Sequence, residues 1–188
     1  MPLVKPGKFR IIGGQWRGRR FPIPALDQVR PTPDRVRETL FNWLANMIVG
    51  ARCLDLFAGS GALGLEAVSR GAAEVVMVDR CPKVIAHLRA IRQSLPAAPI
   101  DIVAADITQP LSLGAGGFDV VFLDPPFRQQ LLPRILPLLV PYFSQHCSIY
   151  VESEAETPLD PGVLPNGFTI SKAKQAGQVA YYLLRNDE

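Results

Sequence analysis

A carboxylate, two prolines and an aromatic ring follow one another in Asp124-Pro125-Pro126-Phe127. They come directly after residues 118–123, an apolar run rich in Val and Phe that predicts a buried strand. Because proline cannot continue a sheet ladder, the strand must end there and the chain must turn. In open α/β sheets, ligands bind at the carboxyl ends of the strands. Hydrogen-bond acceptors beside a flat ring suit a planar group that carries an NH2, although two prolines alone could simply end a strand.

A glycine-rich loop after another short apolar strand is the second candidate site. Gly59, Gly61 and Gly64 fit the pattern G-x-G-x-x-G, in which glycines permit a tight turn and a close approach of the backbone to a ligand. This pattern alone would suit a dinucleotide equally well. The carboxylate of Asp55, just before the loop, would repel a pyrophosphate. It suits a cationic ligand with an ammonium or sulfonium group.

Two further carboxylates follow predicted strands. Asp79 ends the apolar run 74–78, where it can accept hydrogen bonds from ribose hydroxyls. Asp106 follows residues 100–105, where it can bind an adenine amino group. Each acid taken alone is typical of a solvated loop. Acids at three successive strand ends form a pattern that predicts one shared site.

These motifs, in this order, resemble those of the class I S-adenosylmethionine-dependent methyltransferases. The DPPF motif resembles the subgroup that methylates exocyclic or amide nitrogens. The stretches RIIGGQWRGR (residues 10–19) and RPTPDRVRETLFNWL (residues 30–44) look like those of the bacterial small-subunit ribosomal RNA guanine-N2 methyltransferases of the RsmD type. The resemblance covers nearly the whole chain. It implies S-adenosylmethionine as cofactor and 16S ribosomal RNA, in the assembled or assembling small ribosomal subunit, as substrate.

The resemblance also implies which residues form the site. Residues 124–127 would hold the target base, with Asp124 and the Pro125 carbonyl accepting hydrogen bonds from the amine and Phe127 stacking on the ring. Related sequences often carry two acids at the ribose, whereas this chain has a single acid followed by Arg80. The cofactor would be held by Asn42, Asp55, Phe57, Gly59, Gly61, Gly64, Asp79, Arg80 and Asp106.

Other functions share part of this pattern. A DNA adenine-N6 methyltransferase would share the DPPF motif and the glycine loop, but such enzymes usually carry a sizeable target-recognition region. A protein glutamine methyltransferase generally has Asn in place of Asp124 and needs no basic arm. A nicotinamide oxidoreductase would rest on the glycines and Asp79 alone, and Asp55 argues against it. A non-catalytic RNA-binding module would not need a complete cofactor pocket.

Positive charge is concentrated near the amino terminus. Residues 1–37 hold nine Lys or Arg against two Asp, so this segment carries +7 while the remainder sums to −4. Such asymmetry is typical of a polyanion-binding arm joined to a neutral or acidic catalytic core. Trp16 and Phe21 lie among these cations, where they could stack on unpaired bases. The predicted RNA-binding residues are Arg10, Arg17, Arg19, Arg20, Arg30, Arg35 and Arg37.

Length and composition limit the possible classes. At 188 residues with 48% hydrophobic content, the chain is expected to form one core and one globular domain. No apolar stretch reaches the length of a membrane span, and three widely spaced cysteines indicate reduced thiols in the cytoplasm. No metal-ligand spacing is present. We therefore expect a cytoplasmic monomer without a metal ion, a membrane association or a stable protein partner.

The elements expected around these motifs predict an α/β fold of the Rossmann-like class I methyltransferase type. Residues 1–31 should form loops or a basic hairpin that contacts RNA, with 9–12 pairing near 21–23, and residues 32–188 the methyltransferase domain. A helix should begin with Thr32 as its cap. Further helices are expected at 82–95 and 129–139, and late strands near 148–152, 168–173 and 178–184. The alternation predicts a mostly parallel seven-stranded sheet with an antiparallel C-terminal hairpin and helices on both faces.

Overall fold

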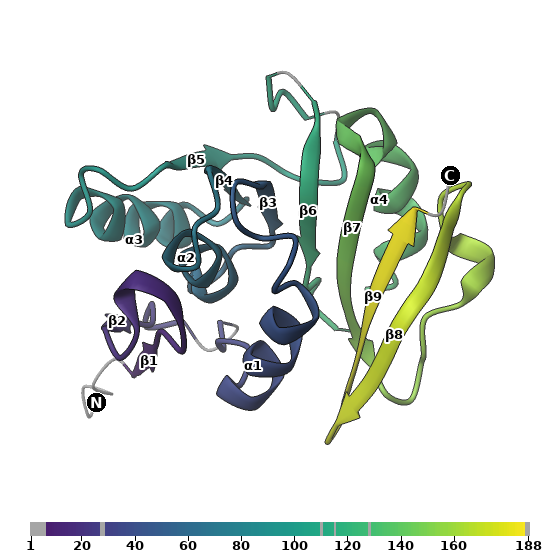
Figure 1. Ribbon diagram of the computed structural model, residues 1–188, viewed down its shortest axis with the longest axis horizontal. Helices are drawn as coiled ribbons and strands as arrows, with labels where there is room; N and C mark the ends of the chain where they lie inside the picture. Colours follow the sequence, from purple (N-terminus) through teal and green to yellow (C-terminus); the bar gives the residue numbers. More distant parts are fainter. Residues whose placement is uncertain (1–6, 27–28, 110, 115, 128, 187–188) are drawn as a thin grey trace.

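The computed structural model describes residues 7–26, 29–109, 111–114, 116–127 and 129–186. Seven strands form one sheet in the order β5-β4-β3-β6-β7-β9-β8, and β1 pairs with β2 in a separate ribbon (Figure 1). Strands β5, β4, β3, β6 and β7 run parallel, whereas β9 is antiparallel to both β7 and β8. The predicted fold class is therefore confirmed.

The strands are β1 (Lys8–Arg10), β2 (Arg20–Pro22), β3 (Arg52–Leu56), β4 (Glu74–Asp79), β5 (Ile100–Ala104), β6 (Phe118–Leu123), β7 (Phe143–Glu154), β8 (Phe168–Ala176) and β9 (Val179–Asn186). The α-helices are α1 (Asp34–Trp43), α2 (Ala62–Ser69), α3 (Pro82–Gln93) and α4 (Leu132–Leu139). Short 3₁₀ turns are η1 (Gly14–Trp16), η2 (Val140–Tyr142) and η3 (Pro161–Val163).

Helices cover both faces of the sheet. On one face, α1, α2 and α3 share an apolar core with strand residues such as Cys53 and Phe122. On the other face, α4 packs in a second core with strand residues such as Leu54 and Leu123. Successive side chains of a strand point to opposite faces, so each central strand supplies both cores. We call these surfaces of the sheet the α1–α3 face and the α4 face.

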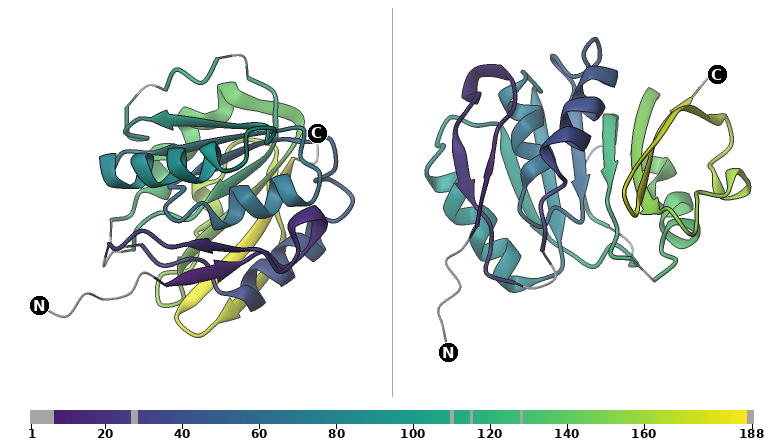
Figure 2. Two further views of the ribbon diagram at one scale, coloured as in Figure 1. Left: turned by 90° about the vertical axis from the view of Figure 1, so that its left-hand side faces the viewer. Right: turned by 90° about the horizontal axis from the view of Figure 1, so that it is seen from below.

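The amino-terminal hairpin packs against the α1–α3 face, close to α2 (Figure 2). Phe9 of β1 lies opposite Phe21 of β2, within the pairing predicted from the sequence. Both rings are buried, with centroids 5.9 Å apart. Phe21 is therefore unable to stack on a base, and that prediction was wrong for this residue. Trp16 is half-buried against the same core.

A buried ion network joins the hairpin to α1 and α2. The carboxylate of Glu66 on α2 accepts hydrogen bonds from the backbone N–H groups of residues 12–13, both at 2.8 Å, and from Arg37 of α1 at 3.3 Å. Arg37 is fully buried and also donates to the backbone carbonyls of Thr32 and Arg10. Its guanidinium presents no surface to a phosphate. The predicted RNA contact of Arg37 was therefore wrong, and the residue stabilises the fold instead.

The start of α1 differs from the prediction. The helix begins at Asp34 with Pro33 as its cap, and no side chain caps it. The Thr32 side chain instead interacts with the carboxyl group of Glu152 of β7, whose pKa it lowers. The amino end of α1 is therefore tied to the sheet by a side chain that the sequence pattern assigned to the helix itself.

The connection after β6 also differs from the prediction, whereas the connection before β6 does not. The helix expected at 129–139 begins at Leu132, because Pro133 fits the first turn of a helix better than its interior. No helix joins β5 to β6 within the described residues of 105–117, and none was predicted there from the sequence. Three glycines in this short stretch disfavour a helix.

No helix within the described ranges has the length and apolar character needed to cross a membrane. The same residues contain no group of three or more His, Cys, Asp or Glu side chains placed to hold a metal ion. Cys53, Cys81 and Cys147 carry free thiols.

Candidate active site

The glycine loop between β3 and α2 is closed tightly onto the sheet. Gly61 has a φ of +78°, and a Cβ atom there would lie 2.8 Å from the nearest side-chain atom. A Cβ atom at Gly64 would lie 2.4 Å from Cε of Met77 and 3.0 Å from Oδ2 of Asp55. The positive φ favours glycine at position 61, and a side chain at position 64 would displace the ends of Met77 and Asp55. Phe57 has a φ of +64°, a costly backbone conformation for a bulky residue and one that clusters at ligand sites.

Asp55 is buried beneath this loop. Its side chain accepts a 2.9 Å hydrogen bond from the backbone N–H of Gly64. Burial is the main cause that raises the pKa of Asp55 to about 7; the Gly64 hydrogen bond opposes the rise and the charge of Asp79 adds to it. A cation beside Asp55 would favour its ionised form. The site therefore has the electrostatic character expected for a positively charged ligand.

Asp79 joins the glycine loop to the end of β4. Its Oδ2 accepts a hydrogen bond from the backbone N–H of Gly59 at 3.1 Å, and its Oδ1 accepts one from Cys81 at 2.8 Å. Each carboxylate oxygen can accept a second bond, so both remain able to bind ribose hydroxyls. The structure thus brings Asp79 to the loop and gives it a second task, which is to hold the loop backbone in place.

A pocket of about 550 Å³ opens next to Asp79, at the carboxyl ends of β4 and β5. Its lining includes Arg80, Cys81 and Asp106. Thr108 donates to Oδ1 of Asp106 from its backbone N–H at 3.0 Å and from its hydroxyl at 2.7 Å, and these bonds lower the pKa of Asp106. Nη1 of Arg80 lies 3.9 Å from Oδ2 of Asp106. The two residues are neighbours where the sequence predicted the adenosine end of a cofactor.

The DPPF turn follows β6 directly, as the sequence predicted. β6 ends at Leu123, and Asp124 begins the turn as a partly buried residue. Pro125 is buried, whereas Pro126 is exposed. Phe127 is 41% exposed, unusual for a large apolar side chain in this chain. The turn therefore presents a carboxylate to the protein interior and an aromatic face to solvent.

Glu152 of β7 is a further carboxylate beside this turn, and it was not assigned a role from the sequence. Its side chain is 3% exposed and accepts a 2.8 Å hydrogen bond from the hydroxyl of Tyr150. Removal from water is the main cause that raises the pKa of Asp124, followed by the charges of Glu152 and Asp55. Burial also raises the pKa of Glu152, while its interactions with Tyr150 and Thr32 oppose the rise. The available signal was an acid directly after an apolar run, the same pattern that singled out Asp79.

Six of the seven arginines predicted to bind RNA are exposed: Arg10, Arg17, Arg19, Arg20, Arg30 and Arg35. They lie on the β1–β2 hairpin, the segment after it and the first turn of α1. Two of them have intramolecular partners, since Arg10 pairs with Asp34 at 3.3 Å and Arg19 lies 5.1 Å from the centre of the Phe21 ring. These six guanidinium groups form the exposed basic surface of the amino-terminal segment.

Asn42 is exposed in the last turn of α1. Among the contacts of the described residues, none joins its side chain to the glycine loop or to the carboxylates at the strand ends. Its role in cofactor binding stays a prediction.

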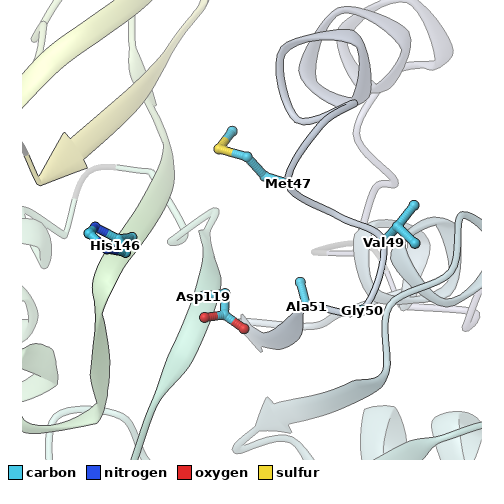
Figure 3. A pocket seen from close by; sticks show the side chains of 6 residues that line it. All are labelled: Met47, Val49, Gly50, Ala51, Asp119 and His146. Atoms are coloured by element: carbon cyan, nitrogen blue, oxygen red, sulfur yellow. The ribbon is translucent and has the colours of Figure 1, made fainter.

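A smaller hollow of about 280 Å³ lies at the opposite edge of the sheet (Figure 3). Residues 47 and 49–51, just before β3, line it together with Asp119 of β6 and His146 of β7. Asp119 accepts a 2.9 Å hydrogen bond from the backbone N–H of Arg52. The hollow is thus formed at the amino ends of the strands, apart from the carboxylates described above.

Comparison with known proteins gives consistent matches along the chain. The family model described as Conserved hypothetical protein 95 matches residues 9–185. The Ribosomal RNA small subunit methyltransferase D of Escherichia coli (strain K12) is 45% identical over 183 residues, which cover 96% of this chain and 91% of that protein. The protein of the same name from Haemophilus influenzae is 40% identical over 192 residues, with 96% and 95% covered.

Solved structures show the same similarity in three dimensions. The yhhF protein of Escherichia coli is 46% identical, with a TM-score of 0.85 over 96% of this chain and 98% of that chain. The HI0767 protein of Haemophilus influenzae is 38% identical, with a TM-score of 0.81 over 97% of this chain and the whole of that chain (100%). The similarity is too extensive to be limited to the sheet, so it includes the amino-terminal hairpin.

Proposed function

The chain belongs to the RsmD family of methyltransferases, and from that premise we propose that it transfers a methyl group from S-adenosylmethionine to the exocyclic N2 of a guanine in 16S ribosomal RNA. The observation that carries this proposal is the turn at Asp124–Phe127, where acceptors for an amine adjoin an exposed aromatic ring at the carboxyl edge of the sheet. The names of the relatives, which specify small-subunit ribosomal RNA, support the substrate class.

The carboxylates at the strand ends fit the three parts of the cofactor. Asp55 lies beneath the glycine loop, where its charge would face the cationic methionine portion. Asp79 would accept hydrogen bonds from the ribose, and Asp106 would accept one from the adenine amino group beside the pocket lined by Arg80. When bound, S-adenosylmethionine supplies a reactive methyl group, so the main task of the protein is alignment.

The DPPF turn would hold the acceptor. The lone pair of guanine N2 is delocalised into the ring, which makes this nitrogen a poor nucleophile. Asp124 and the Pro125 carbonyl would accept hydrogen bonds from its two hydrogens and orient the lone pair toward the methyl group. Phe127, whose ring is open to solvent, would stack on the base. The base must be unpaired or flipped out, which costs a few kcal/mol at most for a loop nucleotide.

The exposed arginines would bind the RNA that surrounds the target. Arginine makes bidentate contacts with phosphate, and six guanidinium groups lie on the hairpin, on the segment after it and at the start of α1. The hairpin is fixed to α1 and α2 by the Glu66 network rather than joined by a free linker. An arm held in this way would dock the RNA at one orientation relative to the DPPF turn.

Radiolabelled methyl transfer from S-adenosylmethionine tests this function. Three substrates are compared: undermodified small ribosomal subunits, the same RNA without protein, and duplex DNA. Label in the subunits that is released as N2-methylguanosine would support the proposal. Label in DNA as N6-methyladenine would refute the substrate but keep the chemistry of the DPPF turn. A rise in melting temperature with S-adenosylhomocysteine, and none with NADH, would separate a methyltransferase from an oxidoreductase.

A further inference from the structure

A β-bulge in β8 changes which face of the sheet its side chains occupy. Ile170 is aligned with Leu184 of β9, but the next aligned pair is Lys172 with Leu183, so Ser171 is an extra residue. Leu184 belongs to the core of the α4 face, whereas Leu183 belongs to the core of the α1–α3 face. Cross-strand partners share a face, so the bulge turns Lys172 to the α1–α3 face.

Lys174 follows the same alignment and lies level with the acceptor site. It is opposite Tyr181 of β9, which is in turn opposite Glu152 of β7. The three residues form one row across three strands, each about 4.8 Å from the next. Because Glu152 neighbours Asp124, this row leads from the proposed base-binding turn to the edge of the sheet. Tyr181 itself contacts Trp43 of α1, with ring centroids 5.5 Å apart.

The β8–β9 hairpin is a basic region within an acidic part of the chain. Residues 161–186 contain three Lys or Arg and no acid, whereas residues 38–160 contain eight Lys or Arg and thirteen acids. Lys172 and Lys174 are exposed, and neither has an acidic partner among the described residues. Viewed from below, the β1–β2 hairpin, α1 and the β8–β9 hairpin follow one another across the molecule (Figure 2).

We propose that Lys172 and Lys174 form a second RNA-binding surface, which contacts phosphates on the side of the target nucleotide opposite the amino-terminal hairpin. This inference rests on the proposed function. In the sheet order, β6 lies between β8 at the edge and the pair of strands β3 and β4, on which α2 and the amino-terminal hairpin pack. The DPPF turn follows β6, so an RNA strand that presents its base to Asp124 would meet cations on both sides. Lysines on an edge strand also discourage pairing with other sheets, but that effect does not depend on which face they occupy.

The chain offers a control that separates position from charge. Ala173 is exposed and aligned with Tyr182, which belongs to the core of the α4 face. The double variant Lys172→Ala/Ala173→Lys therefore keeps the net charge and a lysine on the edge strand, but moves one cation to the other face. It is compared with Lys172→Ala/Lys174→Ala and with the unchanged protein. Melting temperatures with and without S-adenosylhomocysteine establish that each variant is folded and binds cofactor.

Binding to undermodified small ribosomal subunits is measured by filter retention as a function of salt concentration. Removal of both lysines should weaken binding roughly tenfold and reduce the slope of log K against log salt by about two, since each phosphate contact contributes about one. In the charge-preserving variant Lys172→Ala/Ala173→Lys, the slope should fall by about one. A slope equal to that of the unchanged protein in either variant would overturn the inference. If the unchanged protein transfers no methyl label to RNA, the proposed function itself fails. If it does label RNA and the lysine variants bind the subunits as it does, only the second surface is refuted.

Discussion

Asp124 and Glu152 occupy equivalent positions on neighbouring strands, because Leu123 of β6 is aligned with Val151 of parallel β7. Each acid is the next residue in the chain, Asp124 just after β6 and Glu152 within β7, so the two carboxylates meet at the same level and on the α1–α3 face of the sheet. Neither carboxyl group has a cation among its described partners, and the pKa of each is raised. The proposed acceptor site is therefore built around two interacting acids rather than one.

Replacing Asp124 by Ala should reduce turnover by about 10²- to 10⁴-fold, the range measured for a positioned group that handles a proton or orients a reacting atom. The residue lies in the turn after β6, and among the described residues no hydrogen bond joins it to the glycine loop. The dissociation constant for S-adenosylhomocysteine should therefore stay nearly the same. Turnover is measured by methyl transfer and binding by calorimetry. Near-normal turnover would remove Asp124 from the proposed mechanism.

Replacing Glu152 by Gln should change the pH dependence of turnover. The charge of Glu152 raises the pKa of Asp124, so a neutral amide should lower that pKa and extend activity to more acidic pH. Gln retains hydrogen-bonding capacity toward Tyr150 and Thr32, which limits damage to the fold. The turnover number is measured between about pH 5 and 9, with Glu154→Gln at the half-buried last position of β7 as control. If the acidic limb of the pH profile of Glu152→Gln coincided with that of the unchanged protein, the proposed effect of Glu152 on the pKa of Asp124 would be contradicted.

The sheet and the strand-end acids could be predicted from the sequence because both depend on local patterns. An apolar run followed by glycine or proline indicates where a strand ends, and parallel strands bring their carboxyl ends to one edge. This reasoning located Asp55 and Asp79 at the glycine loop and Asp106 beside the pocket next to Asp79. Applied to β7 it would also have found Glu152, whose position after an apolar run carries the same signal.

The remaining features depend on contacts between distant segments. Arg37 lies in a basic stretch, and only the fold shows that Glu66, 29 residues away, neutralises it in the interior. Phe21 among cations suggested base stacking, but the hairpin turns its ring into the core. Thr32 matched a helix cap, whereas β7 supplies its partner. A local sequence pattern does not show whether a side chain faces a distant part of the protein or solvent.

Replacing Asp79 by Ala should weaken cofactor binding and also loosen the glycine loop, because the carboxylate holds the backbone of Gly59 and Cys81. The variant Asp79→Asn retains one acceptor oxygen and should bind more tightly than the alanine variant. Binding of S-adenosylhomocysteine is measured by calorimetry. Asp101→Asn, an exposed acid on β5, is the matched control. A dissociation constant in Asp79→Ala equal to that of the control would rule out this assignment.

Cofactor binding should depend on pH near neutrality through Asp55. The raised pKa of about 7 means that the free protein carries a partly protonated Asp55 at pH 7. A cationic ligand favours the ionised form, so its affinity should increase as the pH rises through 7 and decrease below it. Calorimetry with S-adenosylmethionine between pH 5.5 and about 8.5 measures this change. In Asp55→Asn binding should be weaker and the dependence in this range should disappear; its persistence would assign the titration to another group.

Replacement by Met should affect RNA binding at Arg35 and the stability of the fold at Arg37, although the two residues are only two positions apart on α1. Arg37→Met leaves the buried carboxylate of Glu66 without one of its cations, and breaking a buried pair in this way costs about 3–5 kcal/mol. Arg35→Met removes an exposed charge, so the free energy of unfolding should hardly change. The slope of log K against log salt for RNA binding should fall by about one, the contribution of one phosphate contact. Urea denaturation and binding to small ribosomal subunits measure the two effects. If Arg37→Met unfolded at the same urea concentration as Arg35→Met, the Glu66 network would have no structural role.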